Sequence, residues 1–210
     1  MSEIIVPCGN GSAEITEKRS RFIAFARYAE TEREAAEQTA LLKKTYWDAK
    51  HVVYAYVAAD GTSRSSDDGE PHGTAGKPLL GVITGANVRC CLIAVVRYFG
   101  GILLGTGGLV RAYGEAGRLA LENAGLARLV NLDLYSVSCG YESYRKLSSL
   151  IEAEGGTEQV ADFGEQVTVR FSLPFKAAEG FTKNLTDAFS GSLKMIKIGE
   201  KQGKIPILGE

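Results

Sequence analysis

Three carboxylates stand within four positions in a loop rich in glycine and proline. Asp67, Asp68 and Glu70 lie in the segment SSDDGEPHGTAGKP. Carboxylates so closely spaced could hold a divalent cation such as Mg²⁺ through oxygen ligands. The alternative is that they shape a turn or cap the helix that follows Gly73. The spacing matches no EF-hand loop, so the pattern favours the turn or cap, and Mg²⁺ is the only cofactor it suggests.

A glycine-dense turn follows a long apolar run. Cys90–Val96 is uninterrupted and rich in β-branched residues, which predicts a strand buried on both faces. A helix is expected to begin near Gly107, and the turn could direct free backbone N–H groups at an anion. It matches neither G-x-x-x-x-G-K-[S/T] nor G-x-G-x-x-G, which disfavours P-loop and dinucleotide-binding chemistry. The residues of this candidate anion site are Gly105, Thr106, Gly107 and Gly108.

Basic side chains flank both segments. Lys77 precedes one helix body, Arg97 ends the apolar strand, and Arg111 lies one turn into the glycine-led helix, so the three can share a face and contact phosphate. Sites gather where strands end in α/β sheets, so the loop, the strand end and the turn are expected to converge on one concave surface. That surface would comprise Asp67, Glu70, Arg97 and residues 105–108.

Composition narrows the class of protein. The 210 residues include 24 Lys and Arg against 25 Asp and Glu, so overall charge demands neither nucleic acid nor a membrane. Four cysteines without a C-x-x-C pair and two histidines disfavour a zinc site. His72 is expected to be a polar loop residue, and no catalytic residue can be assigned. Neither a signal peptide nor a run of about 20 apolar residues is found, so a cytoplasmic protein outside the membrane is expected.

Hydrophobic periodicity predicts two domains, residues 1–130 and 131–210. In the first domain, the helix expected at 31–46 should open with a capping box formed by Thr31 and Glu34. Strands are expected near residues 13–18, 22–28, 52–58 and 90–96, and further helices near 75–84 and 107–123. In the last helix, the residues expected to face the sheet are Leu109, Ala112, Ala116, Leu119 and Ala120.

The second domain has the order β-α-β-β-α-β, which is typical of a ferredoxin-like unit. It should form a four-stranded antiparallel sheet with helices on one face, after a connector at 126–131. Residues 199–210 are expected to be a loosely held tail. The strands are expected near residues 132–140, 157–163, 167–173 and 193–198.

Two long motifs resemble the IMPACT family, whose bacterial members are often called YigZ-like. They are DDGEPxGTAGxP from Asp67 and VVRYFGGIxLGxGGLVRAY ending at Tyr113, and the resemblance extends from Ile15 to Gly125. It implies an α+β chain, with a ribosomal-protein-S5-domain-2-like α/β domain followed by a ferredoxin-like domain. Elongation factor G and galactokinase-type kinases use folds related to the first domain.

The resemblance leaves two classes of function open. Eukaryotic relatives regulate translation, so the chain could bind RNA, the ribosome or a translation factor through its basic residues. The alternative is a Mg²⁺-dependent enzyme that acts on a phosphorylated or nucleotide substrate, with the glycine turn on phosphate and the loop carboxylates on the metal. Family members have no firm enzymatic activity, and fold alone does not settle function. The sequence assigns neither the partner nor an oligomeric state.

Overall fold

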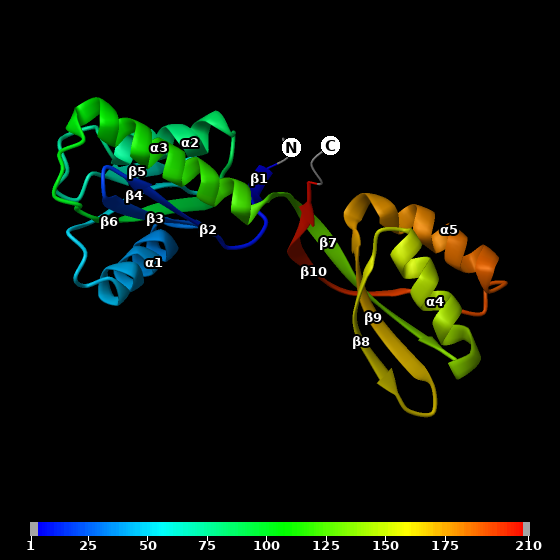
Figure 1. Cartoon of the computed structure of the whole chain (residues 1–210). Coiled ribbons are helices and arrows are strands. Elements are labelled where there is room, and N and C mark those ends of the chain that lie inside the picture. The colour runs from blue at the N-terminus through cyan, green and yellow to red at the C-terminus, as the bar shows by residue number, and fades with distance from the viewer. Residues whose placement is uncertain (1–3, 208–210) are drawn as a thin grey trace. The chain divides into compact units, whose positions relative to one another are not determined.

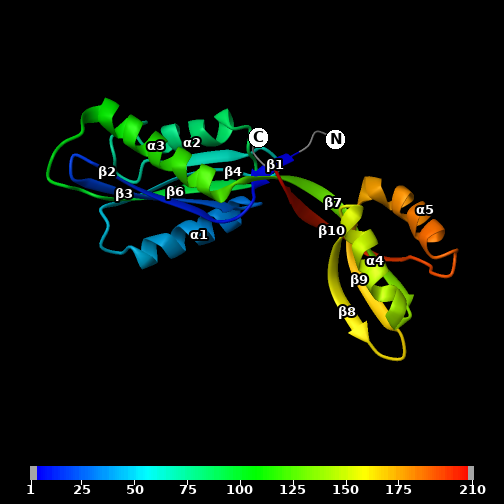
Figure 2. The same ribbon diagram turned by 45° about the vertical axis from the view of Figure 1, so that its right-hand side comes forward.

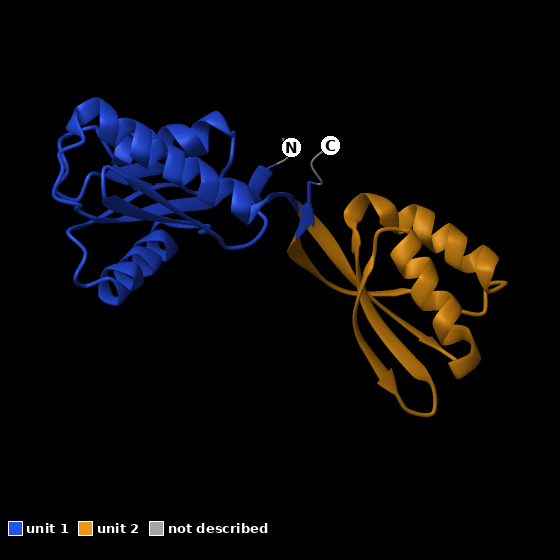
Figure 3. Cartoon of the chain, in the orientation of Figure 1, with its two compact units in different colours: residues 1–129, 204–210 blue, residues 130–203 orange. Residues whose placement is uncertain are grey.

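The computed structural model describes residues 4–207, and contacts divide the chain into two units. Unit 1 comprises residues 1–129 and 204–210, and unit 2 comprises residues 130–203 (Figure 3). The α+β class expected from the sequence is confirmed. The domain boundary expected after residue 130 stays a prediction, and residues 204–210 belong with unit 1.

Unit 1 is built on a five-stranded sheet with the order β2-β3-β6-β4-β5. All of its neighbouring strands pair antiparallel, so the carboxyl end of β6 lies beside the amino ends of β3 and β4. The strands are β2 (Gly11–Glu17), β3 (Ser20–Tyr28), β4 (His51–Val57), β5 (Ser63–Ser66) and β6 (Cys91–Tyr98).

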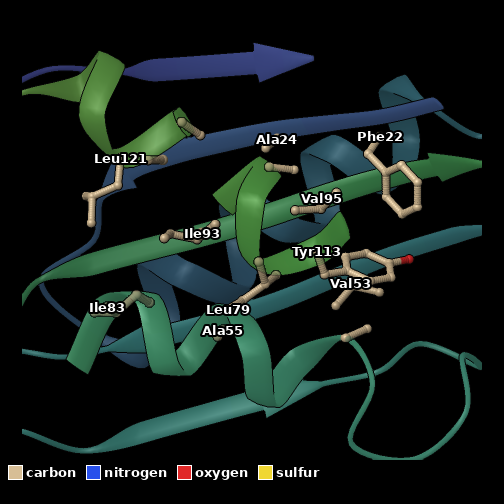
Figure 4. Packing of buried hydrophobic residues seen from close by; sticks show 14 of the residues in the cluster. Phe22, Ala24, Val53, Ala55, Leu79, Ile83, Ile93, Val95, Tyr113 and Leu121 are labelled. Atoms are coloured by element: carbon tan, nitrogen blue, oxygen red, sulfur yellow. The ribbon is translucent and has the colours of Figure 1, made fainter. Parts of the chain in front are cut away.

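Helices cover both faces of this sheet. Helices α2 (Gly76–Gly85) and α3 (Gly105–Ala124) pack on one face and α1 (Glu32–Thr45) on the other (Figures 1 and 2). Strand β6 is accordingly buried on both sides, as the apolar run predicted: alternate residues enter one hydrophobic cluster on the face of α2 and α3 and two smaller clusters on the face of α1. Figure 4 shows the cluster beneath α2 and α3.

Local chemistry explains where two of these helices begin and which side chains they bury. Thr31 caps α1 by accepting the N–H of Glu34 at 3.2 Å, and Glu34 reaches back to the N–H of Glu30 rather than to that of the cap residue. Helix α3 begins at Gly105, two residues before the predicted start. Its buried face includes Tyr113, which the apolar pattern omitted, whereas Leu119 is only partly buried.

Unit 2 carries the ferredoxin-like strand order β10-β7-β9-β8, and β1 (Ile4–Pro7) extends the same sheet along β7. Side chains of α4 and α5, including Leu147 and Phe181, join the hydrophobic cluster of its strands. The remaining elements are β7 (Leu126–Cys139), α4 (Tyr141–Ala153), β8 (Thr157–Phe163), β9 (Val167–Pro174), the 3-10 turn Phe175–Ala177, α5 (Ala178–Ala188) and β10 (Ile196–Pro206).

Two expectations for the ends of this region were wrong. The connector expected at 126–131 is the first part of β7, where Leu126–Leu129 pair with β1. The described part of the tail expected at 199–210 is strand up to Pro206, where β10 ends after pairing with β7, and residues 208–210 lie outside the described residues. The Lys204 ammonium donates to the carbonyl oxygen of Pro7 at 2.9 Å, and this bond holds β10 to β1.

Candidate functional site

Three neighbouring strands bring the polar residues of the site together. In the register of the sheet, Arg97 lies opposite Phe22 on one side and His51 on the other. The chain then turns at Gly100, which lies against the β2–β3 turn: a Cβ there would stand 2.0 Å from the carbonyl carbon of Arg19. Only glycine permits this close approach. The end of β6, the start of β4 and the β2–β3 turn therefore share one end of unit 1.

A buried ion pair occupies this end. The Arg97 guanidinium donates to Glu70 Oε1 at 2.5 Å, and the two residues are 5% and 9% exposed. The Tyr113 hydroxyl donates to the same oxygen at 2.7 Å, and Arg97 also reaches the Ser20 hydroxyl at 3.3 Å. Burial, and then the bond to Glu70, raise the pKa of Tyr113 far above its ordinary value, so the phenol remains a donor. Figure 4 shows Tyr113 beside Phe22.

His51 lies beside this pair with one ring nitrogen committed. Its Nδ1 is 2.7 Å from the carbonyl oxygen of Asp68, which can only accept, so Nδ1 carries the hydrogen. Asp68 itself adopts a positive φ of 45°, an uncommon conformation for a residue other than glycine. The other ring nitrogen of His51, Nε2, lies 3.9 Å from Glu70 Oε1. In the neutral tautomer that the Asp68 bond selects, Nε2 is the acceptor of the ring.

The three loop carboxylates are bound to different partners. Asp67 accepts the N–H groups of Gly73, Ala75 and Gly76, which makes it the cap of α2. Burial would raise the pKa of Asp67, but these three hydrogen bonds outweigh it and hold the pKa below its ordinary value. The alternative of a turn or helix cap thus describes Asp67.

Asp68 and Glu70 give the magnesium hypothesis no more support. Asp68 accepts from the Lys43 ammonium at 2.5 Å and from the N–H of Val52 at 2.7 Å, and these bonds lower its pKa against the opposing effect of burial. Glu70 faces Arg97 instead. Across residues 4–207, no cluster of three His, Cys, Asp or Glu side chains is arranged to hold a metal ion.

A cavity of about 420 Å³ opens in front of the buried pair. Four of the predicted site residues line it: Glu70, Arg97, Gly105 and Thr106. The other predicted residues, Asp67, Asp68, Lys77, Gly107, Gly108 and Arg111, do not. Sequence reasoning missed several lining residues, namely Lys50, His51, Gly69, Pro71, Phe99, Leu103, Leu104 and Leu109.

The three predicted cations occupy different environments. Arg97 was expected to contact phosphate at the surface, but its guanidinium is enclosed by Glu70 and by the rings of Phe22 and Phe99. Lys77 and Arg111 are exposed, as is His72. Arg97 therefore shapes the wall of the cavity and does not belong to the outer basic surface.

The start of α3 is open. The cap residue Leu104 offers no side-chain hydrogen bond, and the first turn contains no acidic residue. A Cβ added at Gly105 would meet no atom within 4 Å, and one at Gly107 would meet only the Arg111 guanidinium, at 4.0 Å. The first N–H groups of a helix have no partner within the helix and attract anions. An anion could thus be bound here by N–H groups and Arg111 together.

Two family models match separate parts of the chain. The family model described as Impact N-terminal domain matches residues 18–121, and one described as a domain of unknown function (DUF1949) matches residues 137–192. An "IMPACT family member" of Haemophilus influenzae is 36% identical over 206 residues, covering 95% of this chain and 100% of its own. "IMPACT family member YigZ" of Escherichia coli is 37% identical over 187 residues, covering 87% and 92%.

A solved structure also matches most of the chain. It is described as the crystal structure of an hypothetical protein, and it aligns with a TM-score of 0.61 and 34% sequence identity. The match covers 94% of this chain and 98% of the other. Within residues 4–207, no helix combines the length and apolarity needed to cross a bilayer.

Proposed function

We propose that this chain, which belongs to the IMPACT family, is a translation-associated regulator that binds RNA of a ribosomal particle, because its resemblance to that family implies a role in translation. The contact surface would be the basic rim, which we define as the exposed cations around the mouth of the cavity. The residues of the basic rim are Lys18, Arg19, Lys50, Lys77 and Arg111.

One observation carries the proposal: the charges of the basic rim are not neutralised by ion pairs within the described part of the protein. None of its five side chains forms an ion pair with any described residue, whereas the acidic residues of the neighbouring loop are bound within the protein. Glu17 is the exposed acidic residue at the start of the same β2–β3 turn. The local charge is therefore positive although the chain as a whole is close to neutral.

The rim residues come from four segments of unit 1. Lys18 and Arg19 form the β2–β3 turn that packs on Gly100, and Lys50 lines the cavity. Arg111 leans back toward the start of α3, and the Lys77 stem lies 3.5 Å from the Cβ position of Gly73 in the acidic loop. A phosphate backbone that crosses the cavity mouth could contact several of these cations at once.

Apolar groups at the cavity mouth favour single-stranded RNA over duplex. Phe99 is 43% exposed and Leu103 is 81% exposed. Single-stranded bases stack on exposed aromatic rings, whereas duplex RNA hides its bases. The Lys50 ammonium lies 5.6 Å from the centre of the Phe99 ring, so one stacked base and its phosphate could both be bound there.

Filter binding of single-stranded RNA over a series of salt concentrations tests the proposal. Each contacted phosphate should contribute about −0.7 to the slope of log affinity against log salt. The double substitution Arg19→Ala with Lys50→Ala should weaken binding to all sequences and flatten the slope by roughly 1.4. Lys183→Ala, in exposed α5, is the matched control and should change neither quantity.

Two results would count against RNA as the partner. The first is an absence of RNA or ribosome association at low salt. The second is capture of a translation factor that survives nuclease treatment and does not respond to the rim substitutions, which would indicate a protein partner. The alternative of a Mg²⁺-dependent enzyme is not adopted, because Asp67, Asp68 and Glu70 are each bound to protein groups.

A further inference from the structure

The cavity in front of Arg97 and Glu70 has unused hydrogen-bonding groups in its lining. We propose that it binds a small phosphate monoester that also bears a hydroxyl group, of the size of a mononucleotide or smaller. The inference does not depend on RNA binding, since four of the five basic-rim residues lie outside the cavity lining and only Lys50 belongs to both.

The phosphate would lie at the start of α3. Gly105 and Thr106 line the cavity, and the first turn of the helix has neither a side-chain cap nor an acidic residue to neutralise it. Backbone N–H groups at a helix start bind phosphate because they are unpaired and carry the positive end of the helix dipole. Thr106 adds a hydroxyl group and Lys50 adds a full positive charge to the lining of the cavity.

A second observation points independently to a ligand. Arg97 also lines the cavity, its side chain is 6% exposed, and its Nε–H is the one buried side-chain polar group among residues 4–207 that lacks a hydrogen-bond partner. Leaving a buried donor of a charged group unpaired is costly, and native structures rarely do so without a reason. An anionic oxygen that reached the Arg97 side chain from the cavity would supply the acceptor that the protein itself does not.

The acceptor in the cavity is His51. Its Nδ1 hydrogen is committed to the Asp68 carbonyl oxygen, and the neutral tautomer that this bond selects has its lone pair at Nε2. Among the described side chains none donates to this nitrogen, and Glu70 Oε1, 3.9 Å away, is itself an acceptor. A ligand hydroxyl would donate to Nε2, which explains why the ligand needs a hydroxyl group as well as an anion.

Charge and size select a monoester. The lining residues include two cations, Lys50 and Arg97, and one anion, Glu70, a net charge of +1 that adds to the dipole of α3. A monoester carries close to two negative charges at neutral pH and a diester only one, so the monoester is favoured. A volume of about 420 Å³ falls in the range of small-molecule sites, and Phe99, Leu103 and Leu109 provide an apolar wall for the organic part.

Proton NMR of the two histidines tests the proposal directly. His51 lies in the cavity wall, whereas the His72 side chain is 91% exposed and serves as an internal reference. Adenosine 5′-monophosphate should shift the His51 ring signals saturably and leave those of His72 in place. Adenosine, and the diester cyclic adenosine monophosphate, should bind at least about tenfold more weakly, a difference of roughly 1.4 kcal/mol.

Gly107→Asp separates binding from folding. An acidic residue in the first turn should stabilise α3, and the Cβ has room, but its carboxylate would compete for the N–H groups. The thermal midpoint should hold or rise while affinity for the monophosphate falls at least about tenfold. Lys50→Ala should weaken binding as well, and Lys183→Ala should not.

Two further arms identify the source of the phosphate. A short RNA with a 5′-phosphate is compared with the same RNA ending in a 5′-hydroxyl. Tighter binding of the phosphorylated RNA indicates that the ligand is an RNA end. Equal binding of the two RNAs, together with tight binding of the mononucleotide, indicates a free metabolite. Both outcomes support the monoester site. No His51 shift with any monophosphate, or equal affinity for the cyclic diester, would overturn it, and RNA binding measured on the same samples would show whether the basic rim is intact.

Discussion

Two buried carboxylates, one in each unit, are built from the same kinds of groups. Glu70 in unit 1 accepts the Tyr113 hydroxyl at 2.7 Å, and Asp133 in unit 2 accepts the Tyr135 hydroxyl at 3.0 Å. Each carboxylate also pairs with one basic side chain. The two clusters thus begin from a shared plan of acid, phenol and base.

They differ in how the base is satisfied. In unit 2, Lys197 is 42% exposed, and its ammonium contacts both Asp133 and Glu200 while reaching water. In unit 1, the Arg97 side chain is 6% exposed, and one of its N–H groups has no acceptor. The comparison indicates that the base of the Asp133 cluster has all the partners it needs, as expected of a cluster with a structural role. The Glu70 cluster is incomplete and borders a cavity, which is the condition expected of a binding site.

The largest expected effect comes from removing Glu70. Glu70→Ala leaves the Arg97 charge buried without a partner, so the free energy of unfolding should fall by about 3–5 kcal/mol. Asp133→Ala should cost less, because Lys197 can turn to water. Urea unfolding followed by circular dichroism measures both, and Glu70→Gln, which keeps an acceptor, should lie between wild type and Glu70→Ala. Equal losses for Glu70→Ala and Asp133→Ala would remove the distinction between the clusters.

A smaller effect is expected at Asp67, whose carboxylate is satisfied by N–H groups. Its folded-state pKa lies below that of the unfolded chain, so its stabilisation is full above the unfolded pKa of about 3.9 and is lost as pH falls through the folded pKa. Asp67→Ala should lower the free energy of unfolding by about 1–2 kcal/mol at pH 7. Asp67→Asn should weaken the dependence of unfolding on pH below about 4. An unchanged acid dependence would contradict the assignment of the cap.

The smallest effect is expected at Glu200, which pairs with Lys197 at the surface. Exposed ion pairs contribute little to stability, because water and salt screen them. Glu200→Ala should therefore leave the urea midpoint almost unchanged, and raising the salt concentration should not alter the result. A loss as large as that of Glu70→Ala would show that this outer ion pair is as important to unit 2 as the buried pair is to unit 1.

Sequence motifs predicted the parts of the candidate site that lie in short contiguous segments. The loop, the strand end and the glycine turn each supply residues to one cavity, which Glu70, Arg97 and Gly105 line. What the motifs could not indicate was the use of each side chain. Arg97 was expected at the surface, yet the apolar run before it already implied burial on both faces.

The residues that sequence reasoning missed depend on strand pairing. Lys50 and His51 lie more than 40 positions before Arg97 and reach it only because β4 pairs antiparallel with β6 in a register that puts His51 opposite Arg97. Hydrophobic alternation reveals a strand but not its neighbour or its register. Tyr113 was missed for a different reason: its ring lies on the buried apolar face of α3, and only its hydroxyl group reaches the site, where it donates to Glu70.

The two ends of the chain have a consequence for engineering. Residues 4–7 and 126–129 pair as strands, the N–H of Ile207 bonds to the carbonyl oxygen of Leu126, and Lys204 reaches Pro7 across 197 positions. A protein whose first and last strands adjoin can have its termini joined by a short linker and new ones opened in a surface loop. The turn around Gly164 is exposed and joins two paired strands. A circular permutant opened there would retain every strand pairing of unit 1.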